Sequence, residues 1–498
     1  MGSVFQLRAF SLHRGIYSLP AYFIVFALLS PFAFFLFNLR TWEWSKDFNF
    51  LYVFAVTVFQ ATVSSLLCLI LALFSSQGLL AFSKKKYYFL IEALVLIPAL
   101  IPPLILALSL VHLVEKISVF PFGLPILIFS QAMTYLGLCS VAMVRIIMKH
   151  SWFLSEWAYL HKVSNFLFFK TLLKTVLLKD IKTLFILVFT SVFTSLSLPL
   201  LLGGSSFYSL EFFIYEKLKD PQLWSQAFSL ILFQCVFVFF ICWKVFSSYS
   251  FSEERISFKK VHLLENPFFI SIPFLAVFFS VGGLFLLFDL SAFNKLKVIL
   301  PLIVKGALNS FFVSFLVAVL TLFFLIGLSL SYQHKKIRKF IASFTSPGVS
   351  FLGFALLLVP FYNEVAVGIK WVVGLTLLLF PWIFRFRGER ALERLDFQVE
   401  TARFLGADEG LIFKKILWPV NRSLFFLCSG IVAFWACGDF SYSLIVSGGH
   451  WNLSLLVYDL FSSYRLNEAV LLSWLLLFVS FFVFMIWLAL AWLYQKVF

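Results

Sequence analysis

Long apolar runs of 18 to 30 residues alternate with short polar segments along this chain of 498 residues. The runs lack the two-residue alternation of strands, so they predict helices long enough to cross a bilayer. Inside a bilayer, only helices and closed barrels satisfy their own backbone groups. We predict twelve spans, near residues 19–39, 50–75, 89–114, 123–147, 182–202, 223–247, 267–289, 303–331, 347–363, 366–384, 423–446 and 469–493. The expected fold class is an all-α polytopic membrane protein.

The composition indicates a lipid environment and argues against a soluble domain and a metal site. The chain is 62% hydrophobic and only 12% charged, which is more apolar surface than a soluble domain can bury. Its six cysteines fall inside apolar runs without a CxxC pair, and its seven histidines lack ligand spacing, so we predict no metal site. The first apolar run lacks an obvious small-residue cleavage site and is interpreted as an anchor.

Positive charge gathers on one side of the predicted membrane. With the N-terminus in the cytoplasm, 29 of the 39 lysines and arginines fall on the inner side. This bias predicts a multi-pass protein of the cytoplasmic (inner) membrane with both termini in the cytoplasm. The net charge of +16 is therefore an orientation signal, and we expect a lipid bilayer and no nucleic acid among the partners.

Two polar loops repeat one another at an offset of 244 residues. Seven of 21 positions are identical between 156–176 and 400–420, and each loop follows the fourth span of its half. An even number of spans in each half predicts two parallel six-helix repeats with a pathway between them. We therefore divide the chain into an N-terminal half, 1–255, with its loop at 149–180, and a C-terminal half, 256–498, with its loop at 387–422.

The second loop predicts a helix, a bend and a second short helix. Four apolar positions recur at helical spacing before the bend: Leu392, Leu395, Val399 and Ala402. Gly406 is suited to end the first helix with a positive φ, and Asp408 to cap the next one, where the first loop has Ser164. Three apolar side chains then form a predicted knob before Pro419: Phe413, Ile416 and Leu417, with Phe169, Leu172 and Leu173 at the equivalent positions. The alternative is that both helices lie on the lipid surface.

This arrangement resembles the EAA loop of binding-protein-dependent ABC importer permeases. The family pattern is Glu-Ala-Ala, three residues, Gly, nine residues, then Ile-x-Leu-Pro. The second loop has Glu400-Thr401-Ala402, Gly406 and Ile416-Leu417-Trp418-Pro419. The first loop keeps Glu156 and Ala158, but it has Lys162 for the Gly, Leu172 for the Ile and Thr175 for the Pro, which weakens the expectation of a bend there. The chain looks like the fused subfamily, in which one polypeptide supplies both permease halves.

The resemblance implies the type I ABC importer permease fold and a role in ATP-driven uptake. Each loop would bind a subunit of a cytoplasmic ABC ATPase dimer, and an extracytoplasmic solute-binding protein would deliver the cargo. The residues it places at the ATPase contact are Glu400, Ala402, Gly406, Asp408, Phe413, Ile416, Leu417 and Pro419, and in the first loop Glu156, Ala158, Phe169 and Leu172. The chain has no GxxxxGK[ST] phosphate cradle, so we expect a transporter subunit that is not an enzyme, binds no cofactor and relies on ATP used by its partner.

The cargo and its pathway are less defined by the sequence. The segment 438–465 is most similar to thiamine permeases, so thiamine or a phosphorylated form is the first candidate and ferric iron the second. Asp439 is a candidate pathway residue because an acid inside a span is costly, about 2.5–3.5 kcal/mol, and usually faces a cavity or a partner. Its alternative role is to cap a helix end or to pair with Lys370 or Arg465. Three other polar span residues are candidates that more often join helices: Gln60, Tyr135 and Asn309.

Two other classes remain open. A secondary transporter of the major facilitator type also has twelve spans in two parallel halves, but its usual basic loop between spans two and three is missing here, and it does not explain the repeated loop. A membrane scaffold without transport is the second alternative.

Overall fold

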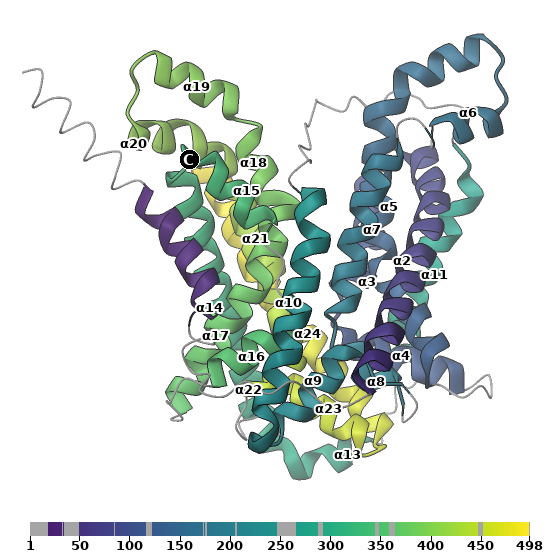
Figure 1. Cartoon of the computed structure of the whole chain (residues 1–498), viewed down its shortest axis with the longest axis vertical. Coiled ribbons are helices and arrows are strands. Elements are labelled where there is room, and N and C mark those ends of the chain that lie inside the picture. The colour runs from purple at the N-terminus through teal and green to yellow at the C-terminus, as the bar shows by residue number, and fades with distance from the viewer. Residues whose placement is uncertain are drawn as a thin grey trace, which may run out of the picture. The chain divides into compact units, whose positions relative to one another are not determined.

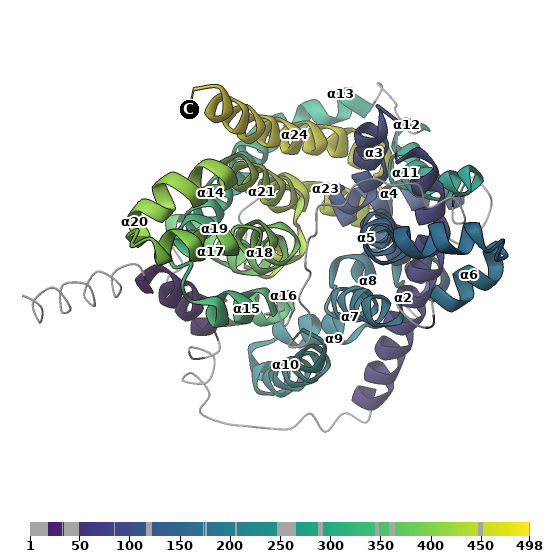
Figure 2. The ribbon, with the colours of Figure 1, turned by 90° about the horizontal axis from the view of Figure 1, so that it is seen from above.

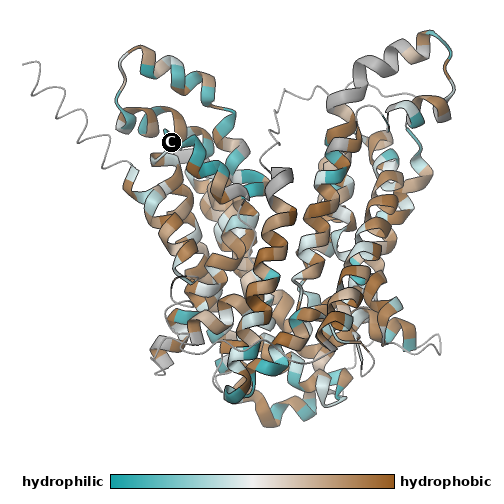
Figure 3. Cartoon of the chain, in the orientation of Figure 1, coloured by the Kyte–Doolittle hydropathy of each residue, from teal (hydrophilic) through white to brown (hydrophobic). Residues whose placement is uncertain are grey.

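The computed structural model describes residues 18–31, 33, 49–83, 85–115, 122–172, 174, 177–204, 207–246, 265–286, 292–343, 348–357, 364–446 and 452–497. Every element within these residues is helical, and none of them is a strand. Among these described residues, eight helices are long and apolar enough to cross a membrane, or nine if one bent pair counts as a single span. The apolar residues run along these helices in Figure 3, while the more polar stretches lie near helix ends and in the loops. The chain is thus a multi-pass, all-helical membrane protein.

The eight long helices coincide with eight of the twelve predicted spans. They are Phe50–Phe82, Leu124–Met148, Pro221–Cys242, Pro267–Phe285, Phe293–Leu330, Val367–Glu393, Glu409–Gly438 and Leu466–Tyr494. The other four predicted spans are shorter or broken, so a count of twelve is not confirmed. The run 89–114 bends by 90° between α3 (Tyr88–Leu100) and α4 (Pro103–Glu115). Ile101 is extended there because two prolines follow it, and a residue before proline avoids the helical region.

The other three predicted spans correspond to helices that are shorter than expected. The run 182–202 divides into α7 (Leu178–Phe193) and α8 (Ser197–Leu202). The run 347–363 contributes α16 (Val349–Leu357), and part of it lies outside the described residues. The first run contributes the short apolar helix Ser18–Pro31. The predicted joint between the halves, near residue 255, also lies outside the described residues.

The chain divides into two compact units that do not follow the two halves of the sequence. Unit 1 comprises 1–43, 301–455 and 475–498, and unit 2 comprises 44–300 and 456–474. Each unit therefore takes a helix from the other half of the sequence. In unit 1, the backbone N–H of Ala21 donates to Oγ of Ser331 at 3.1 Å. In unit 2, the N–H of Gly283 donates to Oγ of Ser109 at 2.9 Å.

Unit 2 is built around α5 (Leu124–Leu160). In Figure 2, which looks along the helices, α5 lies among α2, α3, α4 and α8. α2 comprises Asn49–Phe82, and the unit also contains α6 (Asn165–Leu172), α7, α9 (Leu210–Leu218), α10 (Trp224–Phe246), α11 (Ser271–Val277), α12 (Gly283–Leu286) and α13 (Ala292–Leu296). Gly137 of α5 allows the closest crossing, because a Cβ there would lie 1.9 Å from the carbonyl oxygen of Val95 on α3.

Unit 1 contains the second loop and the helices that carry it. These are α14 (Leu300–Leu330), α15 (Lys335–Ser343), α16, α17 (Glu364–Ile383), α18 (Glu389–Glu393), α19 (Asp396–Phe404), α20 (Glu409–Ile412), α21 (Trp418–Gly438) and α22 (Ser441–Val446). Two helices, α23 (Leu453–Ser462) and α24 (Leu466–Val497), belong partly to each unit. Within unit 1, α19 and α20 lie at the end remote from α16 and α22 (Figure 1).

Candidate functional site

The second loop folds as a helix, a bend and a second helix, as the sequence predicts. Three of the four predicted inner positions of α18 and α19 are buried: Leu392, Leu395 and Val399 are at most 2% exposed. Gly406 has a φ of +84°, and the N–H of Ala407 donates across the bend to the carbonyl of Ala402 at 3.0 Å. This six-residue ring is the Schellman motif that commonly ends a helix at glycine. The predicted bend at Gly406 is confirmed.

The second helix of the loop begins at its predicted cap. Asp408 has extended backbone angles, and its carboxylate accepts from the N–H of Gly410 at 3.2 Å. Arg403 closes the bend from the other side, because its Nε and Nη2 donate to the carboxylate of Glu409 at 2.7 and 2.9 Å. The pair has a side-chain exposure of 28% for Arg403 and 10% for Glu409. A bidentate, partly buried pair of this kind holds two helices at a fixed angle better than an exposed pair.

π-helical turns join the loop to its neighbouring helices on both sides. Phe384–Gly388 lies between α17 and α18, and Phe413–Leu417 lies between α20 and α21. In the first loop, Lys174 and Leu177 also have π-helical conformation. π-turns inside helices are rare and occur often at functional positions.

The apolar side chains that the second loop exposes are not the predicted knob. Leu417 is buried, and Phe413 and Ile416 are half-buried, with the Phe413 ring 6.1 Å from that of Trp418. The three most exposed apolar side chains of the loop are others, and we call them the apolar tip: Phe397 (81% exposed), Phe404 (93%) and Leu405 (79%). Leu411 and Val420 are exposed to a smaller extent. Glu400 and Pro419 are exposed, and Ala402 is half-buried. The one-turn spacing of Phe397, Glu400 and Phe404 along α19 was the available signal for the tip.

Acidic side chains of α19 pair with the basic helix α15. From the sequence, the charges of this helix indicated only the orientation of the chain in the membrane. Lys335 of α15 lies 3.1 Å from a carboxylate oxygen of Asp396 and 2.8 Å from one of Glu400. The hydrogen bond from Lys335 lowers the pKa of Glu400. Burial raises the pKa of Asp396 to about 6, and the charge of Glu400 adds to that shift while Arg403 opposes it. The complementary charges of 335–339 and 396–400 could have indicated this contact.

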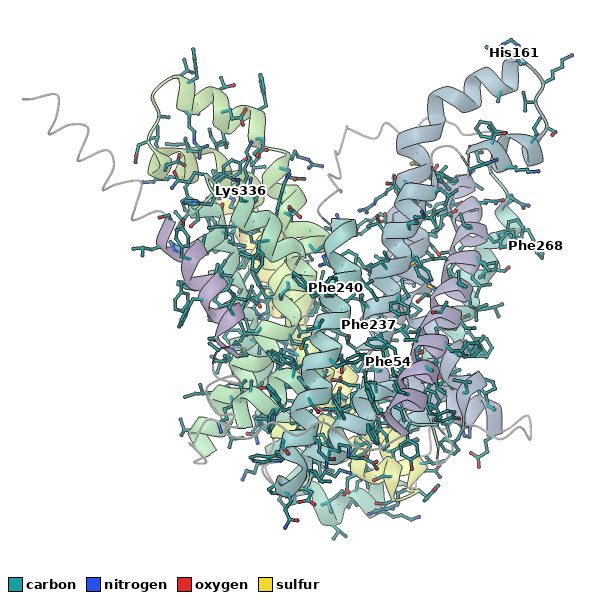
Figure 4. All side chains as sticks on the ribbon, viewed as in Figure 1. Phe54, His161, Phe237, Phe240, Phe268 and Lys336 are labelled. Carbon is teal, nitrogen blue, oxygen red and sulfur yellow. The ribbon has the colours of Figure 1, made fainter. Side chains whose placement is uncertain are left out.

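The first loop bends at the same place without glycine. Lys162, at the position of Gly406, has a φ of +52°, and the N–H of Val163 donates to the carbonyl of Ala158 at 2.9 Å. The hydrogen-bonded ring is therefore the same in both loops, although a lysine rarely adopts this conformation. Oγ of Ser164 accepts from the N–H of Leu167 at 3.4 Å, as predicted for a capping residue. His161, which is labelled in Figure 4, directly precedes Lys162 at this bend.

Part of the first loop's predicted contact lies outside the described side chains. Ala158 is 8% exposed, whereas the side chains of Glu156, Phe169 and Leu172 are not among those described. Lysine in place of glycine at position 162 leaves the bend of the first loop intact.

A second local feature also repeats between the halves. The N–H of Leu210, the first residue of α9, donates to Oγ1 of Thr57 at 2.9 Å. The N–H of Leu453, the first residue of α23, donates to Oγ of Ser310 at 2.9 Å. Each bond ties the start of a short helix to the side of a long span, and the predicted repeat of the two halves would place such a bond in each of them.

Of the pathway candidates, Asp439 has the capping role. Its carboxylate accepts from the N–H of Tyr442 at 3.0 Å and from the hydroxyl of Ser441 at 3.2 Å, at the start of α22. Its carbonyl accepts from the hydroxyls of Ser443 and Ser454. These bonds satisfy the acid locally, which explains how it is tolerated beside a span.

The other three candidates are found on long helices. Gln60 of α2 donates to Gln131 of α5, which also accepts from Ser64 at 3.0 Å, so this amide pair joins two helices. Tyr135 is half-buried on α5. Asn309 is half-buried on α14, next to the residue that binds Leu453. Gln60 and Tyr135 belong to unit 2, and Asp439 and Asn309 to unit 1; a pathway through them stays a prediction.

Two smaller predictions concern metals and thiols. Within the described residues, no group of three or more His, Cys, Asp or Glu side chains could hold a metal ion. All six cysteines are free and buried.

Comparisons of the chain with protein-family models, with curated proteins and with solved structures found no match.

Proposed function

We propose that this chain is the membrane-spanning permease subunit of an ATP-driven importer, coupled to a separate cytoplasmic ATPase through its two loops. The observation that carries the proposal is the second loop: a braced helix–bend–helix that exposes three large apolar side chains at its tip. An isolated exposed leucine or phenylalanine is ordinary, but three on one small projection are typical of a protein interface.

The construction of the loop suits the transfer of force. Its helices are held by a buried apolar face, a glycine bend, a capped second helix and a bidentate ion pair, so the tip is fixed relative to the loop. A rigid projection passes displacement on, whereas a flexible one absorbs it. The same ring of hydrogen bonds at Lys162 supports a second, related projection in the other half.

In this proposal, ATP is bound and hydrolysed by the partner, and the chain contributes the pathway and the coupling surfaces. A solute-binding protein would supply the cargo at the outer face of the inner membrane. The cargo remains thiamine or its phosphate, followed by ferric iron, on sequence resemblance alone.

Two observations weigh against the alternatives. A major-facilitator-type transporter does not account for twin braced loops with an exposed apolar tip. A scaffold could use such a tip, but it would not need the tip to be joined to spans by π-helical turns on both sides.

The test is biochemical. The chain is purified under mild conditions from its native membrane, and the preparation is assayed for co-purified ATPase and for ATP hydrolysis. We expect a stoichiometric ATPase subunit and hydrolysis that disappears when that subunit is stripped away. Hydrolysis by the stripped chain, or uptake that depends on an ion gradient and not on ATP, would reject the proposal.

A further inference from the structure

The contact between α15 and the start of α19 is a compact acid–base cluster. It lies beside the bend, in the same unit, and involves residues that the proposed coupling surface does not use. The hydroxyl of Tyr332 donates to the carboxylate of Asp396 and to the carbonyl of Leu392, the latter at 3.2 Å. Lys335 lies 3.1 Å from Asp396, and Nη2 of Arg338 lies 3.6 Å from it. Three side chains from one corner therefore converge on one carboxylate.

Two members of the cluster are buried, whereas the Lys335 side chain is 44% exposed. Tyr332 has no exposed surface, and Arg338 is 3% exposed with its guanidinium 4.3 Å from the centre of the Tyr332 ring. Nε and Nη1 of Arg338 have no hydrogen-bond partner among the described residues. A buried guanidinium with so few hydrogen bonds relies on the acids around it: Asp396 is its ion-pair partner, and the charges of Glu389 and Glu393 also favour its charged form. Asp396 and Arg338 are thus expected to move together.

The corner is also continuous with a membrane span. Only four residues, 331–334, separate the end of α14 from the start of α15. The turn is closed by backbone bonds from Ser331 to Gly327 at 3.0 Å, from His334 to Ser331 at 3.1 Å and from Arg338 to His334 at 3.1 Å. Such a turn has little freedom to absorb a displacement of α15. In Figure 4, Lys336 marks α15, below α19 and α20 and at the end of the spans.

We propose that Tyr332, Lys335 and Arg338 are positioning residues that link the second loop to α14, so that the loop drives a third span through this cluster, besides α17 and α21, to which the chain joins it. The inference rests on the proposed function for its purpose, but the mechanical link is a property of the chain alone.

The experiment is hydrogen exchange of the full-length chain in lipid nanodiscs, read peptide by peptide. Asp396→Ala removes the common acceptor of the cluster. Asp408→Ala is the matched control, because it removes an acid of the same loop whose carboxylate accepts from the N–H of Gly410 and not from the cluster. We expect Asp396→Ala to speed exchange about tenfold in α15 and in the last turn of α14, as loss of a local anchor does. We expect Asp408→Ala to speed exchange only around the start of α20, which Asp408 caps.

The result that overturns the link is an Asp396→Ala chain whose faster exchange is confined to the loop, like that of the control. If Asp396→Ala does not fold, Tyr332→Phe removes one donor and keeps the ring beneath Arg338. Exchange in α14 that Tyr332→Phe leaves unchanged would overturn the link equally.

A second arm separates this inference from the proposed function. Native-membrane preparations of each variant are scored for co-purified ATPase. If the unmodified chain never brings down an ATPase, the proposed function fails while the exchange result still decides the link. If the ATPase is present and Asp396→Ala retains it but loses the ATP-dependent change of exchange in α14, both stand.

Discussion

At the residue scale, the bends of the two loops compare glycine and lysine in the same conformation. A non-glycine residue in the left-handed region costs about 1–2 kcal/mol. Gly406→Ala should therefore destabilise the second loop by about 1 kcal/mol, although nothing lies within 4 Å of the added Cβ. The measurement is local hydrogen exchange across 396–412.

Gly368→Ala is the control for this substitution. Gly368 likewise has open space around its Cβ, but it lies inside α17 without a positive φ, where alanine is favoured over glycine by about 0.5–1 kcal/mol. We expect Gly406→Ala to destabilise its surroundings and Gly368→Ala to stabilise them. Equal effects would mean that the φ of Gly406 does not limit the loop.

Lys162 provides the reverse test. Lys162→Gly should stabilise the bend of the first loop by about 1 kcal/mol, because it removes the cost that Lys162 carries at a φ of +52°. Slower exchange of the N–H of Val163 would report the gain. Unchanged or faster exchange would show that the lysine side chain contributes something that the backbone does not.

The carboxylate of Asp439 gives a prediction about capping. Asp439→Ala should cost about 0.5–2 kcal/mol, the usual range for loss of a helix cap, whereas Asp439→Asn keeps an acceptor for the N–H of Tyr442. Thermal unfolding in detergent distinguishes them. If Asn proved as harmful as Ala, the negative charge itself would be required, and a role in binding cationic cargo would be favoured.

At the element scale, the contact between α15 and α19 should depend on pH. Burial and the neighbouring charge of Glu400 raise the pKa of Asp396 to about 6, with Arg403 opposing. This acid holds its proton more tightly in the folded chain, so its ionisation destabilises the fold. That destabilisation is absent below about pH 4 and complete above about pH 6. Its ion pairs with Lys335 and Arg338, however, exist only when it is ionised.

Lowering the pH from 7.5 to 5 should therefore loosen α15 locally without lowering the overall stability through this group. Lys335 keeps Glu400 as a partner, because the pKa of Glu400 is lowered. After correction for the intrinsic rate of exchange, opening of α15 should be more frequent at pH 5. Asp396→Asn should remove the part of the difference that this carboxyl causes, and Glu389→Gln tests the other acid that interacts with Arg338 and Lys339 of α15. A pH effect that survives in Asp396→Asn would assign it elsewhere.

Regular elements were predictable where one physical requirement dominated. The apolar runs predicted eight long helices, and the spacing of Leu392, Leu395 and Val399 predicted the buried face of the loop. Gly406 and Asp408 predicted the bend and the cap. The prolines at 102 and 103 indicate the break after Ile101, but hydropathy predicts one continuous span there. Hydropathy does not register the extended backbone that proline imposes on the residue before it.

Tertiary relations were not predictable in the same way. The contact of α15 with Asp396 joins segments 60 residues apart, so no local pattern specifies it. The exposed tip depends on which face of α19 the rest of the unit covers, and this reversed the expectation for Phe413 and Leu417. The bend at Lys162 forms because the hydrogen bonds around it outweigh the preference of lysine, which a sequence pattern based on glycine does not capture.

At the scale of the whole molecule, the sequence halves and the compact units differ. The helix Ser18–Pro31 belongs to the unit that holds most of the C-terminal half, and α11 belongs to the unit that holds most of the N-terminal half. Such an exchange makes each unit dependent on both halves of the sequence. Separately expressed halves should therefore fold only when they are produced together.

The central claim, that the second loop binds a separate ATPase through its apolar tip, is tested most directly by a charge at the tip. Phe404→Asp places a carboxylate on the most exposed of its side chains, and Tyr464→Asp is a matched control at an aromatic residue of unit 2 that is 83% exposed. The measurement is the amount of ATPase subunit that co-purifies with each chain from its native membrane. We predict a loss of at least about tenfold for Phe404→Asp, which corresponds to 1.4 kcal/mol, and none for Tyr464→Asp. Full retention of the ATPase by Phe404→Asp would contradict the account.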